Sequence, residues 1–115
     1  MERRLLIGGE LVAGDGAVLS VENPFTQTEL AQVAAASTAQ VGAAVARAGE
    51  GAKAFAALTA GERGELLKEV AAGLHARTEE LAELMTLEGG KPLVENRDEI
   101  GWTAAAFDYY AEIAR

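Results

Sequence analysis

Few side chains in this sequence could act as a nucleophile, acid or base at a common site. The chain has no cysteine, which removes the thiolate nucleophile, the disulfide and the cysteine metal ligand. His75 is the single histidine and falls near the end of an expected helix, where a role in complementing the helix dipole is simpler than catalysis. Ser20 and Ser37 have no neighbouring base. We therefore predict no catalytic residue in this chain.

Acidic residues cluster at Glu95, Asp98 and Glu99, in the first turns of the last expected helix. The positive end of the helix dipole favours negative charge there, so a structural role competes with a functional carboxylate pair. Gly14 and Gly16 could suggest a phosphate-binding loop, but Leu19 stands where the third glycine is needed and no helix follows. We predict a hairpin turn instead, and no cofactor-binding residue.

The most informative stretch is the expected short helix 79–91, which runs into Thr86-Leu87-Glu88-Gly89-Gly90-Lys91-Pro92. Paired glycines suit a helix end that needs a left-handed residue, and Pro92 suits the first turn of a new helix. The turn carries one carboxylate, Glu88, and one ammonium group, Lys91. A solvated helix-end carboxylate is one interpretation of Glu88.

The elements that must position these residues follow from turn signals and apolar periodicity. Extended segments are expected at 4–7 and 10–13, joined by Gly8-Gly9, and at 18–22 and 29–35, joined by a turn that Asn23-Pro24 begins. Four helices should follow, with capping boxes at Ser37 and Thr59 and a third start at Thr78. The second should turn Leu66, Leu67, Val70 and Leu74 inward. The fold class is α/β, with β-hairpins in residues 1–36 and helices in residues 37–115.

The last expected helix, residues 92–115, carries apolar side chains almost all round its circumference, and we expect Tyr109-Tyr110 to serve core and interface packing. A helix of this kind is normally buried inside something larger. The hairpins and three alanine-rich helices of a 115-residue chain offer too little surface to bury this helix. We therefore expect either a piece of a larger protein or one half of an interface.

Composition excludes two partner classes. The formal net charge is −8, whereas nucleic acids and anionic membranes are bound by clustered lysine and arginine. No segment approaches the roughly 20 apolar residues that span a bilayer, and no signal-peptide pattern follows the basic residues at the N-terminus. We predict no nucleic acid or membrane partner and a cytoplasmic location.

Four motifs, taken in order, resemble the start of the NAD(P)-dependent aldehyde dehydrogenase superfamily. They are Ile7-Gly8-Gly9-Glu10, Val21-Glu22-Asn23-Pro24-x-Thr26, Glu79-x-Leu81-Ala82 with the 86–92 turn, and Phe107-Asp108-Tyr109-Tyr110-Ala111. The motifs follow one another in the order and spacing of the superfamily, and together they span essentially the whole chain. Superfamily members are several times longer, so the resemblance covers an N-terminal quarter.

The resemblance implies an α/β cofactor-binding domain, a catalytic domain that carries a cysteine, and a small oligomerisation domain in a homo-oligomer. In such an enzyme the thiolate attacks an aldehyde, hydride passes to NAD or NADP, and water releases the acid. The family's nucleophile, glutamate, oxyanion-stabilising asparagine and nucleotide-binding glycines all lie downstream of this segment. The resemblance therefore implies part of the cofactor-binding domain, inactive alone, whose partners are the rest of the parent enzyme or other subunits.

Two site assignments follow from the resemblance. The positions similar to a family K⁺ or Na⁺ site are Val21 and Glu22, through their carbonyls, and Glu88. Trp102 resembles a position that faces the family's substrate tunnel, where its ring would narrow the tunnel or contact an aromatic or cationic substrate. Core packing is the alternative for Trp102.

A second class of function also fits the sequence. A small, acidic, non-enzymatic interaction module could dock through its apolar last helix into a partner groove. That helix supports this alternative as well as it supports a piece of an enzyme.

Overall fold

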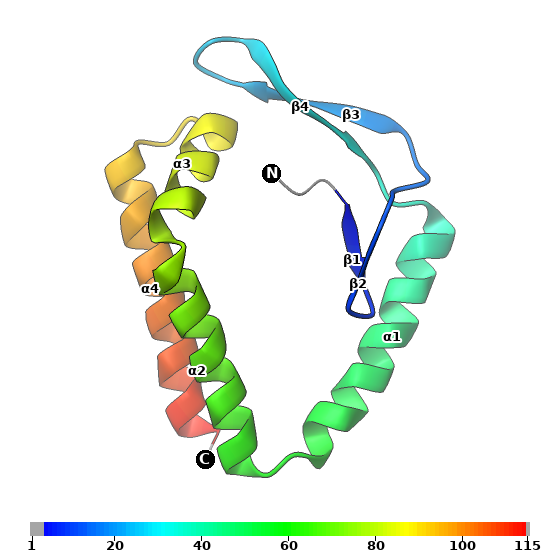
Figure 1. The fold of residues 1–115 in the computed structure, drawn as a ribbon, viewed down its shortest axis with the longest axis vertical. Coiled ribbons are helices and arrows are strands. Elements are labelled where there is room, and N and C mark those ends of the chain that lie inside the picture. Colours follow the sequence, from blue (N-terminus) through cyan, green and yellow to red (C-terminus); the bar gives the residue numbers. More distant parts are fainter. Residues whose placement is uncertain (1–3, 115) are drawn as a thin grey trace. The chain divides into compact units, whose positions relative to one another are not determined.

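The computed structural model describes residues 4–114, which form two hairpins followed by four helices (Figure 1). The chain divides into two compact units, Met1–Ala57 and Leu58–Arg115. The first holds both hairpins and the first helix, and the second holds the other three helices. The predicted order of elements is therefore confirmed. The predicted boundary at residues 36 and 37 concerns domains of a longer enzyme and stays a prediction.

The first hairpin pairs β1 (Leu5–Ile7) with β2 (Glu10–Val12) in antiparallel register, with Ile7 opposite Glu10. The two turn residues, Gly8 and Gly9, have φ values of 61° and 88°. Two-residue hairpin turns of this type need positive φ at both central positions, which glycine adopts without steric cost. The predicted Gly8-Gly9 turn is confirmed.

The second hairpin pairs β3 (Val18–Asn23) with β4 (Thr28–Ala34), with an irregularity between Val21 and Glu22. The Asn23 side chain makes the turn, because its Oδ1 accepts hydrogen bonds from the backbone N–H groups of Phe25 at 2.9 Å and Thr26 at 3.2 Å. Strand pairing extends one residue beyond the predicted Glu22, to Asn23.

Helix α1 (Thr38–Ala57) begins at the predicted capping box. The backbone N–H of Gln40 donates to Ser37 Oγ at 3.3 Å, and the backbone N–H of Ser37 donates to Gln40 Oε1 at 3.0 Å. Gln40 does more than cap the helix: Oε1 also accepts from the backbone N–H of Asp15 at 3.0 Å, and Nε2 donates to the Ala13 carbonyl at 2.7 Å. One side chain therefore fastens the loop between the hairpins to the start of α1.

The second unit contains α2 (Ala60–Ala76), α3 (Thr78–Gly89) and α4 (Leu93–Ile113). Helix α4 contacts both α2 and α3, and α2 runs beside it in Figure 1. The predicted capping box of α2 is confirmed, since the backbone N–H of Glu62 donates to Thr59 Oγ1 at 3.3 Å and the Thr59 N–H donates to Glu62 Oε2 at 2.8 Å. Within residues 4–114, no helix is both long and apolar enough to cross a membrane.

The interior of this unit is built from small side chains. Ala71, Ala82, Ala104 and Ala111 are buried, and the only larger side chains buried with them in the described unit are Ile100 and Asn96. Alanine lets helices approach closely, so little side-chain volume is needed between them.

The predicted inward face of α2 is partly wrong. Leu66 and Val70 are 43% and 44% exposed, whereas Leu67 and Leu74 are half-buried and Ala71 and Gly64 face the interior. The buried positions of α2 are thus held by small residues, and the larger Leu66 and Val70 lie on its exposed side.

Helix α4 does carry apolar groups on its outer side, as predicted. Trp102, Tyr109 and Ile113 are each more than 60% exposed. Their spacing of seven and four residues places them on one stripe, opposite the buried stripe of Ile100, Ala104 and Ala111. Tyr109 and Tyr110, expected in core and interface packing, are both exposed and contact each other edge to face with ring centroids 5.4 Å apart. The core part of that expectation is wrong for this chain.

Candidate functional site

The turn between α3 and α4 has the predicted construction. Gly90 adopts a left-handed conformation with φ of 76°, and its N–H donates to the Thr86 carbonyl at 2.9 Å. Pro92 precedes the first residue of α4, and the Asn96 N–H donates to the Pro92 carbonyl at 3.1 Å. Glycine supplies positive φ at the helix end and proline fixes φ at the next helix start, so the turn follows from these two residue types.

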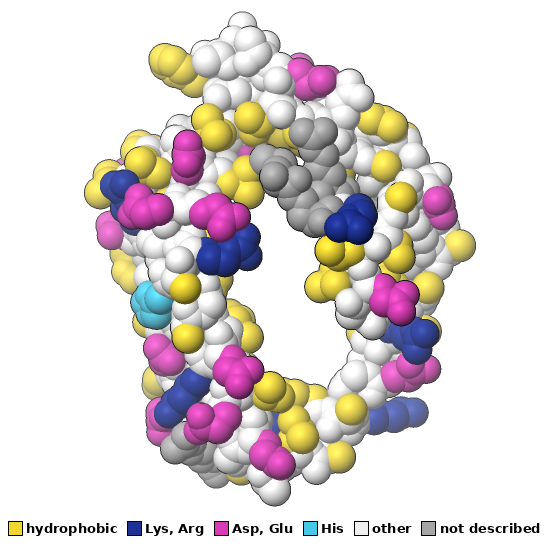
Figure 2. Space-filling model, in the orientation of Figure 1, with side chains coloured by type: hydrophobic (Ala, Val, Ile, Leu, Met, Phe, Trp, Pro, Cys, Tyr) yellow, Lys and Arg dark blue, Asp and Glu magenta, His cyan; other side chains and the backbone are white. Residues whose placement is uncertain are grey.

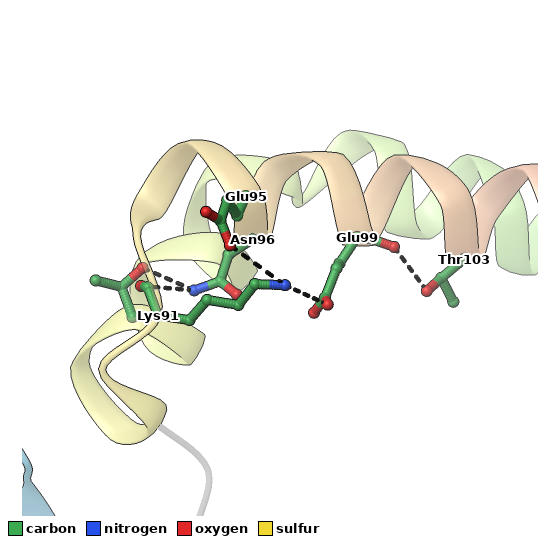
Figure 3. A network of polar contacts seen from close by, with 6 residues as sticks. Lys91, Glu95, Asn96, Glu99 and Thr103 are labelled. Carbon is green, nitrogen blue, oxygen red and sulfur yellow. Dashed lines mark hydrogen bonds and ion pairs between the residues drawn. The ribbon is translucent and has the colours of Figure 1, made fainter.

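Asn96 holds this turn from inside and was not singled out from the sequence. Its side chain is 1% exposed, and its Nδ2 donates to Thr86 Oγ1 at 2.8 Å and to the Lys91 carbonyl at 3.2 Å (Figure 3). The amide therefore links the last turn of α3, the loop and the first turn of α4. The signal that could have revealed it is an amide residue four and eight positions before Ile100 and Ala104, on the same inward stripe.

Lys91 is engaged by carboxylates from α4. Its ammonium group hydrogen-bonds to Glu99 and lies 3.9 Å from Glu95 (Figure 3). Thr103, one turn beyond Glu99, donates its hydroxyl to the Glu99 carbonyl at 2.8 Å. The predicted acidic cluster thus serves in part as the counter-charge of Lys91, while Asp98 is exposed on the same helix.

A second ion pair joins α3 to α4 on the surface. Arg97 donates to both carboxylate oxygens of Glu79, with nitrogen–oxygen distances of 2.6 to 3.0 Å. This hydrogen bonding lowers the pKa of Glu79 from its ordinary value, with a smaller contribution from the Arg97 charge. Within the same unit, Figure 2 shows acidic and basic side chains interspersed over the helices rather than gathered in a basic patch.

The predicted cation ligands fall in different units. Val21 and Glu22 lie at the irregularity of β3 in the first unit, and Glu88 lies in the last turn of α3 in the second. Within residues 4–114, no hydrogen bond or ion pair engages the exposed Glu88 carboxylate, and no cluster of three or more acidic, histidine or cysteine side chains could hold a metal. A carboxylate with backbone carbonyls suits a hard cation such as K⁺ or Na⁺. Joint coordination by the three residues stays a prediction.

Trp102 lies beside an open groove of about 670 Å³ in the second unit, which we name the α3–α4 groove. Its lining includes Leu81 and Met85 from α3 and Glu99, Trp102 and Thr103 from α4. Trp102 is 71% exposed, so the alternative of core packing does not hold for this chain. The groove offers apolar contacts and one carboxylate, which suits binding rather than bond-breaking.

Comparison with known proteins gives one consistent result. A sequence model of the Aldehyde dehydrogenase family matches residues 11–115. The mitochondrial succinate-semialdehyde dehydrogenase of Arabidopsis thaliana is 40% identical over 111 residues, which are 96% of this chain and 21% of that protein. The chain thus spans about a fifth of the length of the curated relatives it matches.

Solved structures agree with the sequence match. The NAD-dependent benzaldehyde dehydrogenase from Corynebacterium glutamicum superposes with a TM-score of 0.94 at 27% identity, covering 99% of this chain and 25% of that one. The structure of PnpE in complex with nicotinamide adenine dinucleotide gives a TM-score of 0.91 at 36% identity, covering 98% and 24%. Two hairpins and four helices therefore recur as one segment of much longer chains. The chain belongs to the aldehyde dehydrogenase family.

Proposed function

We propose that this chain forms the N-terminal quarter of an NAD(P)-dependent aldehyde dehydrogenase. The reaction converts an aldehyde, water and NAD(P)⁺ into a carboxylic acid, NAD(P)H and a proton. The observation that carries the proposal is the family match over residues 11–115, supported by the superposition of 99% of the chain on a quarter of a dehydrogenase named as NAD-dependent. The cofactor would supply the hydride acceptor.

The chain's own contribution is structural and substrate-facing. Without a cysteine it holds no thiolate nucleophile, so the reacting group must come from further polypeptide. The helices of the second unit would form part of the cofactor-binding domain, and Trp102 would line the substrate tunnel. By itself the 115-residue chain should not oxidise aldehydes.

Glu88 and the carbonyls of Val21 and Glu22 would hold a K⁺ or Na⁺ ion. Support comes from the oxygen chemistry of these groups and from the unengaged Glu88 carboxylate. The ion would tie the β3 strand to the end of α3 and act on stability rather than on the reaction itself.

We further propose a cytoplasmic homo-oligomer that binds neither nucleic acid nor membranes. The net charge of −8 supports the exclusion of polyanionic partners. The Arabidopsis thaliana relative is named as a mitochondrial protein, so fractionation of the native protein is the measurement that decides the location of this one.

The transcript beyond codon 115 tests the proposed function. We expect an in-frame continuation that encodes a cysteine and a glycine-rich nucleotide-binding loop. A stop codon directly after residue 115 would contradict the enzyme proposal and favour the second candidate.

That second candidate is a non-enzymatic module that docks through α4. The exposed stripe of Trp102, Tyr109 and Ile113 is the observation that favours it. A partner-bound module would bury this stripe without any cofactor, whereas the dehydrogenase would bury Tyr109 and Ile113 against its own polypeptide and leave Trp102 at the substrate tunnel. Solvent protection of Tyr109 in the purified family-length protein, meaning the full polypeptide that contains this chain, would favour the dehydrogenase.

A further inference from the structure

Strand β3 has an open edge. The β3–β4 sheet has two strands, and within residues 4–114 no third strand pairs with either of them (Figure 1). The Ala35 N–H donates to the Ala17 carbonyl at 2.9 Å, so the hydrogen-bonding groups of Ala17 face β4. Because these groups alternate in direction along a strand, the N–H and C=O groups of Val18 and Ser20 point away from β4. Backbone donors and acceptors therefore line the open edge.

The sequence does not protect this edge. Natural edge strands are commonly blunted by lysine, proline or a bulge. Residues 5–46 contain no lysine or arginine, and neither β3 nor β4 contains proline. The irregularity between Val21 and Glu22 affects only the far end of β3, so residues 18–21 form a regular stretch. A two-stranded pair is marginally stable in water and gains stability when a third strand joins it.

Apolar side chains are exposed on both faces of β3. Val18 is 64% and Leu19 is 55% exposed, and successive side chains of a strand point to opposite faces. Their cross-strand neighbours on β4 are Ala34 and Val33, which do not cover them. Polypeptide packed against one face would cover only one of the two side chains. A strand added at the β3 edge lies beside both, because its own side chains alternate in the same way.

Charge restricts which strand fits. Glu22 lies directly opposite Glu29 in the β3–β4 register, and like charges in that position are unfavourable. The Glu29 carboxylate accepts hydrogen bonds from Ser20 at 2.8 Å and from Gln32 at 3.1 Å. Among the described residues, no hydrogen bond or ion pair engages the Glu22 carboxylate. A lysine or arginine beside Glu22 would offset the repulsion. A second copy of β3 or β4 cannot supply one, since glutamate is the only ionisable residue type in both strands.

We propose that β3 pairs through its open edge with a third β-strand that carries a lysine or arginine beside Glu22. The strand comes from further polypeptide of the same enzyme, so the inference rests on the proposed function. Length supports this source, because the chain covers 25% of the benzaldehyde dehydrogenase on which it superposes, which leaves about three-quarters of such a chain to supply the strand. The K⁺ or Na⁺ ion would use the Glu22 carbonyl, whereas the third strand would contact its carboxylate.

Hydrogen exchange of single backbone amides tests the pairing. The 115-residue chain and the family-length protein are compared by deuterium labelling and mass spectrometry, with fragmentation that resolves residues 17–23. The Leu19 amide, which faces β4, should be protected in both proteins. The amides of Val18 and Ser20 should exchange at least about tenfold more slowly in the family-length protein than in the 115-residue chain. Equal rates of these two amides in both proteins would overturn the pairing.

Two substitutions at Val18 separate edge pairing from burial of one face. Val18→Pro removes an N–H that the β3–β4 pairing does not use, and proline is tolerated at the first residue of a strand. Val18→Thr keeps the N–H and replaces one methyl group by a hydroxyl. In the family-length protein, Val18→Pro should speed exchange of the Ser20 amide about tenfold and Val18→Thr less than about twofold. Equal effects of the two substitutions would show that a face is buried and would overturn edge pairing.

Charge variants test the basic partner. In the family-length protein, Glu22→Lys should speed exchange of the Ser20 amide several-fold, because it places like charges side by side. In the 115-residue chain the same substitution should slow exchange of the Leu19 amide, since it removes the repulsion with Glu29. Glu10→Gln, at an exposed carboxylate of β2, is the matched control and should change neither rate. Slower exchange of the Ser20 amide in the family-length Glu22→Lys variant, or an unchanged rate, would overturn the basic partner.

The inference and the proposed function can fail separately. A family-length protein that oxidises aldehydes but leaves the Val18 and Ser20 amides unprotected would refute the inference alone. A stop codon directly after residue 115 would refute the proposed function and, with it, the source of the third strand.

Discussion

Asn96 shows how one buried amide can fix the geometry of the turn between α3 and α4. Its Nδ2 reaches a hydroxyl on α3 and a carbonyl in the loop, so both acceptors depend on one side chain. A buried polar group without its partner costs about 1–3 kcal/mol. The amide thus stabilises the α3–α4 turn from the inside, where water cannot replace it.

Replacement of Asn96 by alanine should lower the free energy of unfolding by about 1–3 kcal/mol, because Thr86 Oγ1 and the Lys91 carbonyl lose their donor. Urea unfolding followed by circular dichroism measures the change. Asp98→Ala, an exposed substitution two residues further along α4, is the matched control and should stay within about 0.5 kcal/mol of the wild type. Equal losses in both variants would contradict the role of Asn96.

The predicted cation site can be tested by removing the negative charge of the Glu88 carboxylate. If its carboxylate and the carbonyls of Val21 and Glu22 hold K⁺ or Na⁺, these ions should modestly raise the melting temperature at fixed ionic strength. Glu88→Gln keeps the shape but removes the charge, so the variant should not respond.

A choline salt at the same ionic strength is the control, since general screening acts on both proteins alike. The measurement belongs in the family-length protein. Identical melting temperatures of the wild type in choline, Na⁺ and K⁺ would leave Glu88 as a solvated helix-end carboxylate.

At the scale of elements, the ends of helices and hairpins could be predicted, but the packed faces could not. Gly8-Gly9, Ser37, Thr59 and Gly90 act through local backbone geometry, which neighbouring residues determine. The inward side of α2 depends on which surface α4 presents.

Gly64 and Ala71 take the buried positions of α2, and the heavier Leu66 and Val70 lie on its exposed side. Gln40 illustrates the same limit: its capping role is local, but its bonds to Asp15 and Ala13 connect residues 25 and 27 positions away. For the site, the Gly90 turn could be predicted from the sequence, which left the exposure of Trp102 open. Asn96 needed the three-dimensional contact.

The surface pair Glu79–Arg97 joins α3 to α4 and should make their association depend on pH. Hydrogen bonding to Arg97 holds the Glu79 carboxyl pKa below its ordinary value of 4.5. Between the lowered and the ordinary pKa, the folded protein therefore binds fewer protons than the unfolded protein. The stabilisation is therefore present above the ordinary pKa and is lost as the pH falls through the lowered one.

In the Glu79→Gln variant, stability should fall less steeply below about pH 5 than in the wild type, because the contribution of Glu79 to this fall is removed. Thermal unfolding of the two proteins across pH 3 to 7 measures the difference. Both side chains are exposed, so the effect should be small and should shrink in high salt. A difference that persists unchanged in high salt would contradict an ion-pair origin.

At the scale of the whole molecule, the chain has a defined fold, an exposed apolar stripe on α4 and no cysteine. Helix α4 packs against α2 and α3 on one side and exposes Trp102, Tyr109 and Ile113 on the other. A solved dehydrogenase contains the same segment as a quarter of its length. The exposed stripe and the absence of cysteine are both accounted for if further polypeptide covers α4 and supplies the nucleophile.

In the proposed enzyme, this chain contributes scaffold and substrate wall, and the reacting groups lie on further polypeptide. The most direct measurement is aldehyde-dependent NADH or NADPH formation, followed by absorbance, with the 115-residue chain and the family-length protein assayed side by side on aromatic and aliphatic aldehydes. We predict no formation above background with the 115-residue chain and clear turnover with the family-length protein. Turnover by the 115-residue chain, or none by the family-length protein with either cofactor, would contradict the account.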